Sequence, residues 1–302
     1  MPELPDVANY VEALEGFTLG RELRVFELSN PFVLRTVEPG PNDLVGRRVE
    51  GYRRFGKRIV FAFEDELFLV LHLMIAGRLR WRALDAKGPG GPKRTLANLT
   101  FDDGRLWLTE VSSRKRASLH VVRGEDALEP FRRAGLEVLD ADFDSFRAAL
   151  TAQNRTLKRA MTDPRILSGI GNAYSDEILF HARLSPVVLT SRLSDAELLR
   201  LFEATRTTLT VWTDRLRAEV GDGFPEKVTA FHPEMAVHGR YREPCRACGK
   251  PIQRIRYANN ECNYCAECQN AGRLLADRGL SQLMRKDWPK TLEELEELRG
   301  GD

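Results

Sequence analysis

The sequence is poor in cysteine and nearly balanced in charge. Only 5 of its 302 residues are cysteine, and all five fall between positions 245 and 268. That is too few for a disulfide scaffold, and the clustering favours a bound metal in a reducing compartment, so we expect a cytoplasmic protein. Lys and Arg number 46 against 44 Asp and Glu, a net charge of +2. Any basic surface for nucleic acid must therefore be local.

Long apolar runs are also missing. The most apolar stretch, from Leu67 to Gly77, contains His72; it is too short to span a membrane and is typical of a buried strand. The first six residues are acidic and precede no apolar stretch, unlike a signal peptide. Gly and Pro, 23 and 15 residues, are too few for a collagen-like or disordered chain. We expect a globular protein of one large or two ordinary domains without a membrane partner.

The first part of the chain is predicted to be one helix followed by strands. Pro5 suits a first helical turn, and the spacing of Val7, Tyr10 and Leu14 predicts a helix that ends at Gly16. The pattern then becomes β-like and predicts a β-sandwich or barrel. The expected strands cover residues 47–53, 58–63, 67–73, 79–82, 96–101, 106–110 and 118–122.

The second part is predicted to be mostly helical. Helical periodicity begins near Asp144, after breaks between residues 125 and 143. Ser194 starts the best-marked helix because Ser194-Asp-Ala-Glu197 is a capping box. A Cys-rich hairpin and a tail that is helical from about Arg273 follow. The chain is therefore expected to be an α+β protein, divided at residues 1–130, 131–238, 239–270 and 271–302.

The cysteines show a metal-binding spacing. Sixteen residues separate the pairs Cys245-x-x-Cys248 and Cys265-x-x-Cys268, as in a zinc ribbon, where each pair gives two thiolates to a tetrahedral ion. Four thiolates leave no open position, so we predict one structural Zn²⁺ bound by these four residues. Two alternatives remain: Cys262 could replace one ligand, since Cys262-Asn-Tyr-Cys265 is also such a pair, or the thiols are simply buried.

Basic residues surround the first cysteine pair. Between positions 240 and 256 only Glu243 is acidic, a local excess of +5 that is able to engage phosphates. The alternative is a merely solvated hairpin. The basic residues are Arg240, Arg242, Arg246, Lys250, Arg254 and Arg256.

A glycine turn precedes a helix at Gly169-Ile-Gly-Asn172. Such a turn exposes backbone N–H groups at the positive end of the helix dipole, which is how helix starts bind phosphate. Asn172 is a typical N-cap residue, and Lys158 could add a positive charge. A tight turn between helices is the alternative interpretation.

The amino terminus offers a third group of reactive residues. If Met1 is removed, Pro2 presents a secondary amine, and α-amines titrate near pH ~8, far below lysine. A free amine beside the carboxyl of Glu3 is suited to attack a sugar C1′ and form an iminium. A terminus without defined structure is the alternative.

These segments together resemble the formamidopyrimidine-DNA glycosylase and endonuclease VIII family. The resemblance rests on Met1-Pro-Glu-Leu-Pro-Asp-Val7, Gly-Ile-Gly-Asn172 and the four-cysteine ribbon, and extends from the first residue to about Gln269. Three shorter pieces occur in the same order: Phe-Gly-Lys57-Arg, His72-Leu-Met-Ile-Ala-Gly and Val-His-Gly-Arg240.

The resemblance implies a bifunctional DNA glycosylase and abasic-site lyase of base-excision repair, with a helix-two-turn-helix DNA-binding domain. The enzyme would flip out a damaged base of double-stranded DNA, excise it and cut the strand by β- and δ-elimination. Pro2 would be the nucleophile, Glu3 the general acid, and Lys57 a contact near the scissile phosphates. Further DNA contacts would be His72, Lys158 and Asn172. A nucleoid-associated monomer of bacterial type is expected.

The sequence departs from the family pattern at several points. Asn260 stands where the ribbon usually has an arginine, for which Arg254 or Arg256 could substitute. Residues 109–117 replace the usual Asp-Pro-Arg-Arg-Phe-Gly loop, and Ile75 takes the position of a wedge methionine. The alternative function is therefore a non-catalytic or lyase-only binder of damaged, abasic, branched or single-stranded DNA.

Overall fold

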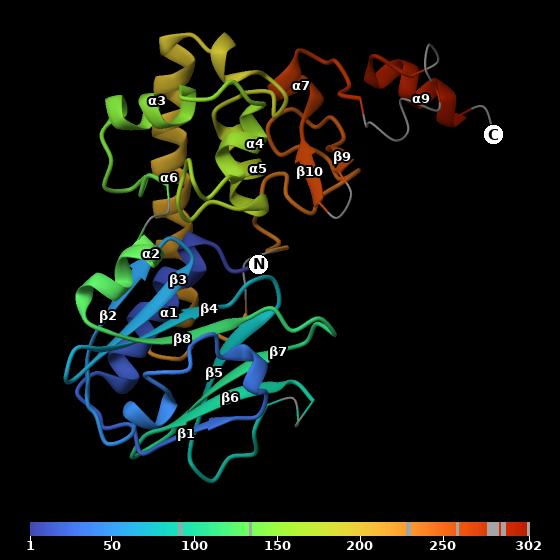
Figure 1. Cartoon of the computed structure of the whole chain (residues 1–302). Coiled ribbons are helices and arrows are strands. Elements are labelled where there is room, and N and C mark those ends of the chain that lie inside the picture. Colours follow the sequence, from blue (N-terminus) through green and yellow to red (C-terminus); the bar gives the residue numbers. More distant parts are fainter. Residues whose placement is uncertain are drawn as a thin grey trace. The chain divides into compact units, whose positions relative to one another are not determined.

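The chain folds into two compact units (Figure 1). The computed structural model describes residues 1–302 except 90, 92, 133–134, 228–230, 258–259, 277–283, 285–287 and 301–302, and it leaves the side chains of 257, 260, 299 and 300 undefined. Unit 1 comprises residues 1–134 and 211–229; unit 2 comprises 135–210 and 230–302. Helix α6 (Asp195–Val220) contributes residues to both units. The four-part division expected from the sequence remains a prediction.

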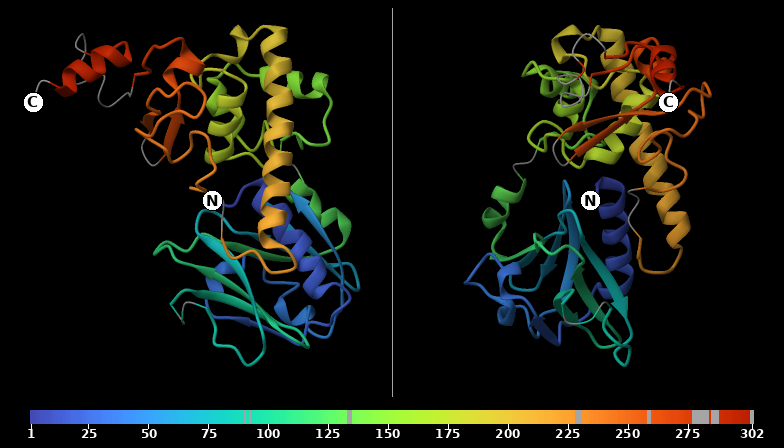
Figure 2. Two further views of the ribbon diagram at one scale, coloured as in Figure 1. Left: turned by 180° about the vertical axis from the view of Figure 1, so that it is seen from behind. Right: turned by 90° about the vertical axis from the view of Figure 1, so that its right-hand side faces the viewer.

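Unit 1 is a β-sandwich with one long helix, as expected. Two four-stranded antiparallel sheets have the strand orders β2-β3-β4-β8 and β1-β6-β7-β5. Their inner faces share one hydrophobic core, which Val7, Tyr10 and Leu14 of α1 also enter, and Figure 2 shows α1 alongside the strands. The elements are α1 (Leu4–Thr18), β1 (Val25–Leu28), β2 (Val49–Phe55), β3 (Arg58–Phe63), β4 (Leu67–His72), β5 (Gly77–Arg82), β6 (Thr95–Thr100), β7 (Arg105–Glu110), β8 (Ser118–Arg123) and α2 (Glu129–Arg132), with short 3₁₀ turns at Pro31–Val33, Pro41–Asp43 and Glu125–Leu128.

All seven expected strands form, and two details of the prediction were wrong. Helix α1 continues past Gly16 to Thr18, because Gly16 has no positive φ and Thr18 Oγ1 donates to the Leu14 carbonyl at 2.7 Å. Strand β1 was not expected. Phe26 is its one buried residue, so this four-residue strand shows little alternation in the sequence.

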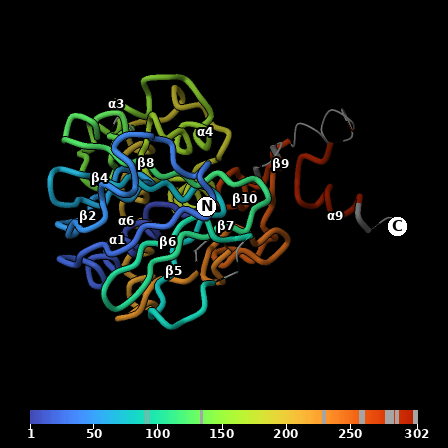
Figure 3. The backbone as a smooth tube through the Cα atoms, turned by 60° about the horizontal axis from the view of Figure 1, so that its bottom comes forward, coloured from blue at the N-terminus to red at the C-terminus, as the bar shows by residue number. Residues whose placement is uncertain are grey.

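Unit 2 is mostly helical and carries a two-stranded hairpin. The capping box at Ser194 is confirmed: the Glu197 backbone donates to Ser194 Oγ at 3.3 Å, and Ser194 N–H donates to Glu197 Oε2 at 2.9 Å. Strands β9 and β10 pair antiparallel, and Figure 3 labels both along the backbone. The elements are α3 (Phe143–Thr151), α4 (Leu157–Thr162), α5 (Asn172–His181), a 3₁₀ turn (Thr190–Arg192), the first part of α6, β9 (Gln253–Tyr257), β10 (Asn260–Tyr264), α7 (Ala266–Asn270) and α9 (Leu292–Gly300).

The described part of the tail packs on the hairpin. Leu292 of α9 is buried against Ile255 and Tyr264. Arg273 forms an antiparallel bridge with Thr291, so the chain is extended where the sequence predicted the start of a helix; residues 277–283 and 285–287 of the predicted helical tail lie outside the described residues, and α9 is helical as expected. No helix in the described part of the chain is long and apolar enough to cross a membrane.

Candidate functional site

The amino terminus of unit 1 is fixed by the start of α1. Pro2 and Glu3 are buried, and Glu3 is the N-cap residue. Its backbone N–H donates to Asp6 Oδ2 at 2.8 Å, half of a capping box that the sequence did not reveal because the N-cap is not Ser or Thr. Lys57 lies in the turn between β2 and β3, where Gly56 adopts φ +58°.

Electrostatic coupling unites these groups into what we call the amino-terminal cluster: the terminal amine, Glu3, Asp6, Lys57 and Arg78. Burial lowers the pKa of the Met1 α-amine; Glu3 and Asp6 oppose this, and Arg78 and Lys57 add to it. Burial also lowers the pKa of Lys57, with Glu3 and Asp6 opposing. The cluster therefore places an amine with a lowered pKa beside the carboxyl group of Glu3 and a lysine that is shielded from water. Arg78 was missed from the sequence, where it is one of three alternating arginines.

His72 ends strand β4 as a neutral imidazole. Burial lowers its pKa to about 4, and the charges of Arg58, Lys57 and His120 contribute. Its Nδ1 accepts the Met74 backbone N–H at 3.1 Å, so the single proton of the neutral ring lies on Nε2. The side chain can thus donate one hydrogen bond without carrying charge.

The turn between β4 and β5 exposes an apolar residue. A Cβ on Gly77 would lie 2.3 Å from the Leu73 carbonyl oxygen, so only glycine fits. Arg78 Nη1 donates to the Gly77 carbonyl at 2.6 Å and to the Ile75 carbonyl at 3.3 Å. This turn leaves the Ile75 side chain 55% exposed.

A second apolar residue is exposed on the loop after β7. Glu110 is buried and accepts the backbone N–H groups of Arg116 and Ala117 at 2.9 and 3.0 Å. Its carboxylate closes the loop and leaves Val111 65% exposed. Nothing in the sequence singled out Glu110, because its partners are backbone groups.

In unit 2, Lys158 and Asn172 lie next to each other. Lys158 Nζ donates to the Asn172 carbonyl at 2.7 Å and to Asp176 Oδ1 at 2.6 Å. The expectation that Asn172 caps α5 was wrong: Gly171 is the N-cap, and Asn172 Nδ2 instead donates to the Glu261 carbonyl of β10 at 2.7 Å. The sequence did not identify Asp176, whose role depends on residues distant along the chain.

The structure brings the four outer cysteines together. The Sγ atoms of Cys245, Cys248, Cys265 and Cys268 all lie within 4.8 Å of one another. A tetrahedral ion with Zn–S bonds of about 2.3 Å requires separations of about 3.8 Å, and the observed pairs of 3.9 Å (Cys245–Cys268) and 3.4 Å (Cys248–Cys265) fit a metal ion. Cys262 is not in this group. Burial raises the pKa of its thiol well above its usual value, helped by the charge of Asp176.

The expected basic patch around the cysteines is largely neutralised. Glutamates from other segments approach it: Arg246 pairs with Glu234 at 3.2 Å and Lys250 with Glu293 at 3.8 Å. Counting charges only between positions 240 and 256 overestimated the positive potential, because ion pairing depends on the fold.

The two arginines expected to contact DNA lie on β9. Arg254 and Arg256 approach Glu261 Oε2 at 3.5 and 4.0 Å. Arg254 stacks 4.0 Å from the ring centroid of Tyr241, and Arg256 is 64% exposed. Asn260 is the first residue of β10, and its side chain lies outside the described part of the structure.

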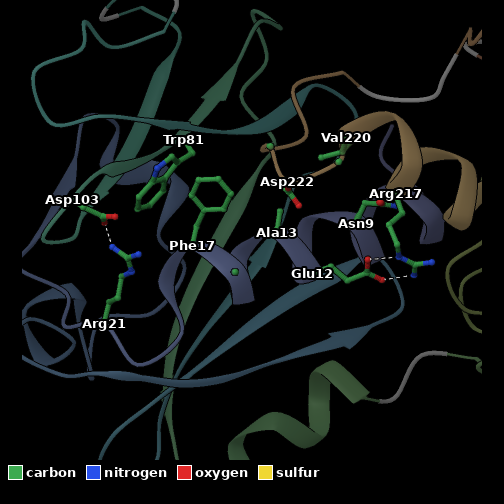
Figure 4. A pocket seen from close by; sticks show the side chains of 13 residues that line it. Asn9, Glu12, Ala13, Phe17, Arg21, Trp81, Asp103, Arg217, Val220 and Asp222 are labelled. Carbon is green, nitrogen blue, oxygen red and sulfur yellow. Dashed lines mark hydrogen bonds and ion pairs between the residues drawn. The ribbon is translucent and has the colours of Figure 1, made fainter.

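A cavity of about 490 Å³ in unit 1 contains none of the predicted site residues (Figure 4). The outer face of α1 and the end of α6 line it, together with Trp81. Both arginines that line it are in ion pairs: Arg21 with Asp103, and Arg217 Nη2 with Glu12 Oε1 at 2.6 Å. The predicted chemistry is therefore separate from this cavity.

Two regions of the chain match models of known domains. Residues 1–118 match the formamidopyrimidine-DNA glycosylase N-terminal domain, and residues 134–215 match the formamidopyrimidine-DNA glycosylase H2TH domain. A formamidopyrimidine-DNA glycosylase of Heliobacterium modesticaldum is 33% identical over 282 residues, covering 89% of this chain and 100% of that protein. One of Listeria monocytogenes is 30% identical over 279 residues, with the same coverage.

Solved structures give the same result. The Lactococcus lactis formamidopyrimidine-DNA glycosylase, non-covalently bound to DNA containing an abasic site, has a TM-score of 0.78 at 27% identity and covers 89% of this chain and 99% of that chain. The Thermus thermophilus protein has a TM-score of 0.74 at 32% identity, covering 89% and 98%.

Proposed function

Because the chain belongs to the formamidopyrimidine-DNA glycosylase family and is a DNA glycosylase of base-excision repair, we propose that its amino-terminal cluster carries out both base excision and strand cleavage. The observation that supports this most strongly is the coupling of the terminal amine to Glu3 and Lys57. A buried amine with a lowered pKa is a better nucleophile at neutral pH than an exposed one.

The proposed reaction begins at Pro2, whose nitrogen becomes the terminal amine when Met1 is removed. The neutral nitrogen attacks C1′, the N–C1′ bond replaces the glycosidic bond, and the base leaves with the proton that the nitrogen loses. Glu3, acting in its carboxylic acid form, gives its proton to O4′; the C1′–O4′ bond breaks, the nitrogen lone pair forms the iminium, and Glu3 is left as a carboxylate. Loss of a C2′ proton expels the 3′ phosphate, and a second elimination, with loss of the C4′ proton, expels the 5′ phosphate. Lys57 and the neutral His72 are proposed to bind the phosphates on either side.

Unit 2 is proposed to bind the DNA backbone and one structural Zn²⁺. Lys158, Asn172, Arg254, Arg256 and Asn260 are the proposed DNA contacts. Zinc bound by the four outer cysteines would have no open coordination position, so its part would be to stabilise the hairpin. A damaged or abasic duplex is the proposed partner of a monomeric, nucleoid-associated protein in the cytoplasm.

A second candidate function is lyase activity with little base excision. The exposed apolar residues on the two loops of unit 1 described above are Ile75 and Val111, which are aliphatic rather than aromatic. An aliphatic wedge stacks poorly in the gap left by a flipped base, whereas unpaired, single-stranded DNA needs less gap filling.

Borohydride trapping tests the proposed chemistry. Protein whose lack of Met1 has been verified by mass spectrometry is incubated with two duplexes, one with an abasic site and one with an oxidised base. We expect a trapped adduct that maps to Pro2, and its loss in Pro2→Gly. An adduct on another residue would exclude Pro2 as the nucleophile. Trapping only on the abasic duplex would favour the lyase.

A further inference from the structure

Asp176 is a buried carboxylate that joins three separate segments of unit 2. Its Oδ1 accepts from Lys158 Nζ of α4 at 2.6 Å. Its Oδ2 lies 2.8 Å from His238 Nδ1 and accepts the Asn263 backbone N–H of β10 at 3.1 Å. The side chain is 0% exposed, so these contacts form without competition from water.

The ammonium of Lys158 is held at two points. Besides Asp176 Oδ1, Nζ donates to the Asn172 carbonyl at 2.7 Å. An ammonium has three N–H donors, so within the described contacts one donor remains for a ligand. The Lys158 side chain is 12% exposed, which keeps it within reach of the surface.

The partners of Asp176 keep it charged. Burial alone raises the pKa of this carboxyl, but Lys158 and His238 outweigh burial and the pKa is lowered. A buried charge is costly unless its partners stay in place, so the carboxylate strongly restricts where the lysine can lie.

The neighbouring Glu177 fixes one of the same segments. Its carboxylate accepts the backbone N–H groups of Ala236 at 2.7 Å and of Val237 and His238 at 2.9 Å. Two consecutive carboxylates of α5 therefore hold the segment 236–238 and strand β10 around the lysine.

We propose that Asp176 is a positioning residue for DNA binding. It fixes Lys158 so that the remaining N–H meets a DNA phosphate, and it links this lysine to His238 and β10. The inference deepens the proposed function, because it rests on Lys158 contacting phosphate. The opposite effect, in which the carboxylate competes with phosphate for the lysine, predicts tighter binding when the negative charge is removed.

A double-mutant cycle on the full chain, loaded with zinc, tests this proposal. The four proteins are wild type, Asp176→Asn, Lys158→Met and the double variant. The probe is a duplex with one tetrahydrofuran site, which cannot form an iminium. We expect each single variant to bind about tenfold more weakly and to lose about one unit of the slope of log affinity against log salt. The double variant should bind no more weakly than Lys158→Met.

Asp163→Asn is the matched control. Asp163 is also a shielded carboxylate of unit 2, paired with Arg155 at 2.7 Å and Arg165 at 2.8 Å. Asp163→Asn should lower the melting temperature without changing the slope of log affinity against log salt. If Asp176→Asn does not fold, Asp176→Glu takes its place in the cycle, since it keeps the charge but displaces the carboxylate.

Three results would overturn the proposal. One is unchanged or tighter binding by Asp176→Asn, and another is additive losses in the double variant. The third is unchanged binding by Lys158→Met, which would also remove the proposed phosphate contact. Trapping at Pro2, measured on the same proteins, reports separately on the proposed chemistry.

Discussion

Asp6 Oδ2 accepts the backbone N–H of Glu3 at 2.8 Å. Glu3, proposed above as the general acid beside Pro2, is thus held by a carboxylate three positions further along the chain, in α1. This bond orients the terminal segment relative to the helix axis. The same carboxylate opposes the lowering of the pKa of both the terminal amine and Lys57. One short side chain thus contributes to both the geometry and the charge of the amino-terminal cluster.

Replacing Asp6 should impair both stability and chemistry. We expect Asp6→Ala to lose about 1 kcal/mol of unfolding free energy, as for other helix caps, and to trap abasic DNA more slowly. Urea unfolding and single-turnover trapping measure the two effects. Asp43→Ala is the control, because Asp43 Oδ2 makes the same bond to the Gly40 N–H at 2.7 Å outside the cluster. Equal trapping by the Asp6 and Asp43 variants would contradict the role of Asp6 in the site.

The trapping rate should depend on pH through the terminal amine. Burial lowers the pKa of the Met1 α-amine, with a contribution from Lys57, and we expect the same direction for the amine of the neighbouring, buried Pro2 once Met1 is removed. The free-base form therefore predominates already at a pH lower than ~8, where an ordinary α-amine titrates. We expect the trapping rate to rise with pH and to reach its plateau before that value. Removing the charge in Lys57→Met should raise the amine pKa and shift the profile to higher pH. Lys87→Met, at an exposed loop residue, is the control and should leave the pH profile unchanged. If the Lys57→Met profile does not shift, the charge of Lys57 does not influence the pKa of the amine.

His72 should make the protein sensitive to acid. Burial lowers the pKa of His72 to about 4 from 6.5, so between these values the unfolded chain binds a proton that the folded chain does not. Stability therefore falls as the pH drops from 6.5 toward 4. When the pH is lowered from 7.5 to 4.5, we expect the unfolding free energy of wild type to fall by about 2 to 3 kcal/mol more than that of His72→Gln. The exposed His181, changed to Gln, is the control, and an equal loss in all three proteins would argue against the buried neutral ring.

Zinc content should separate Cys248 from Cys262. Cys248→Ser removes a proposed ligand and should reduce bound zinc below one equivalent and weaken DNA binding by loosening the hairpin. Cys262→Ser replaces a buried thiol outside the cluster and should retain one equivalent. Metal analysis of the purified proteins measures the stoichiometry, and salt-dependent binding measures the consequence. Zinc loss in Cys262→Ser with retention in Cys248→Ser would reassign the ligand set.

The sequence by itself determined much of the fold. The β-like pattern located all seven expected strands: some alternate between buried and exposed positions, such as β8, and others are nearly continuous apolar runs, such as β3 and β4. The cysteine spacing also identified the group that comes together, because two Cys-x-x-Cys pairs flanking a hairpin return to the same place. Local signals sufficed here because each pattern reflects a local geometry.

Only the tertiary structure decided how the charges are arranged. Glu293 neutralises part of a patch that looks strongly basic in sequence, and Asp176 meets His238 across 62 positions of chain. The carboxylate of Glu110 accepts hydrogen bonds from backbone N–H groups, and no residue type in the sequence identifies such partners. The physical reason is that pKa values and ion pairs depend on desolvation and on distances of a few ångströms, and folding alone sets these for residues far apart in the chain.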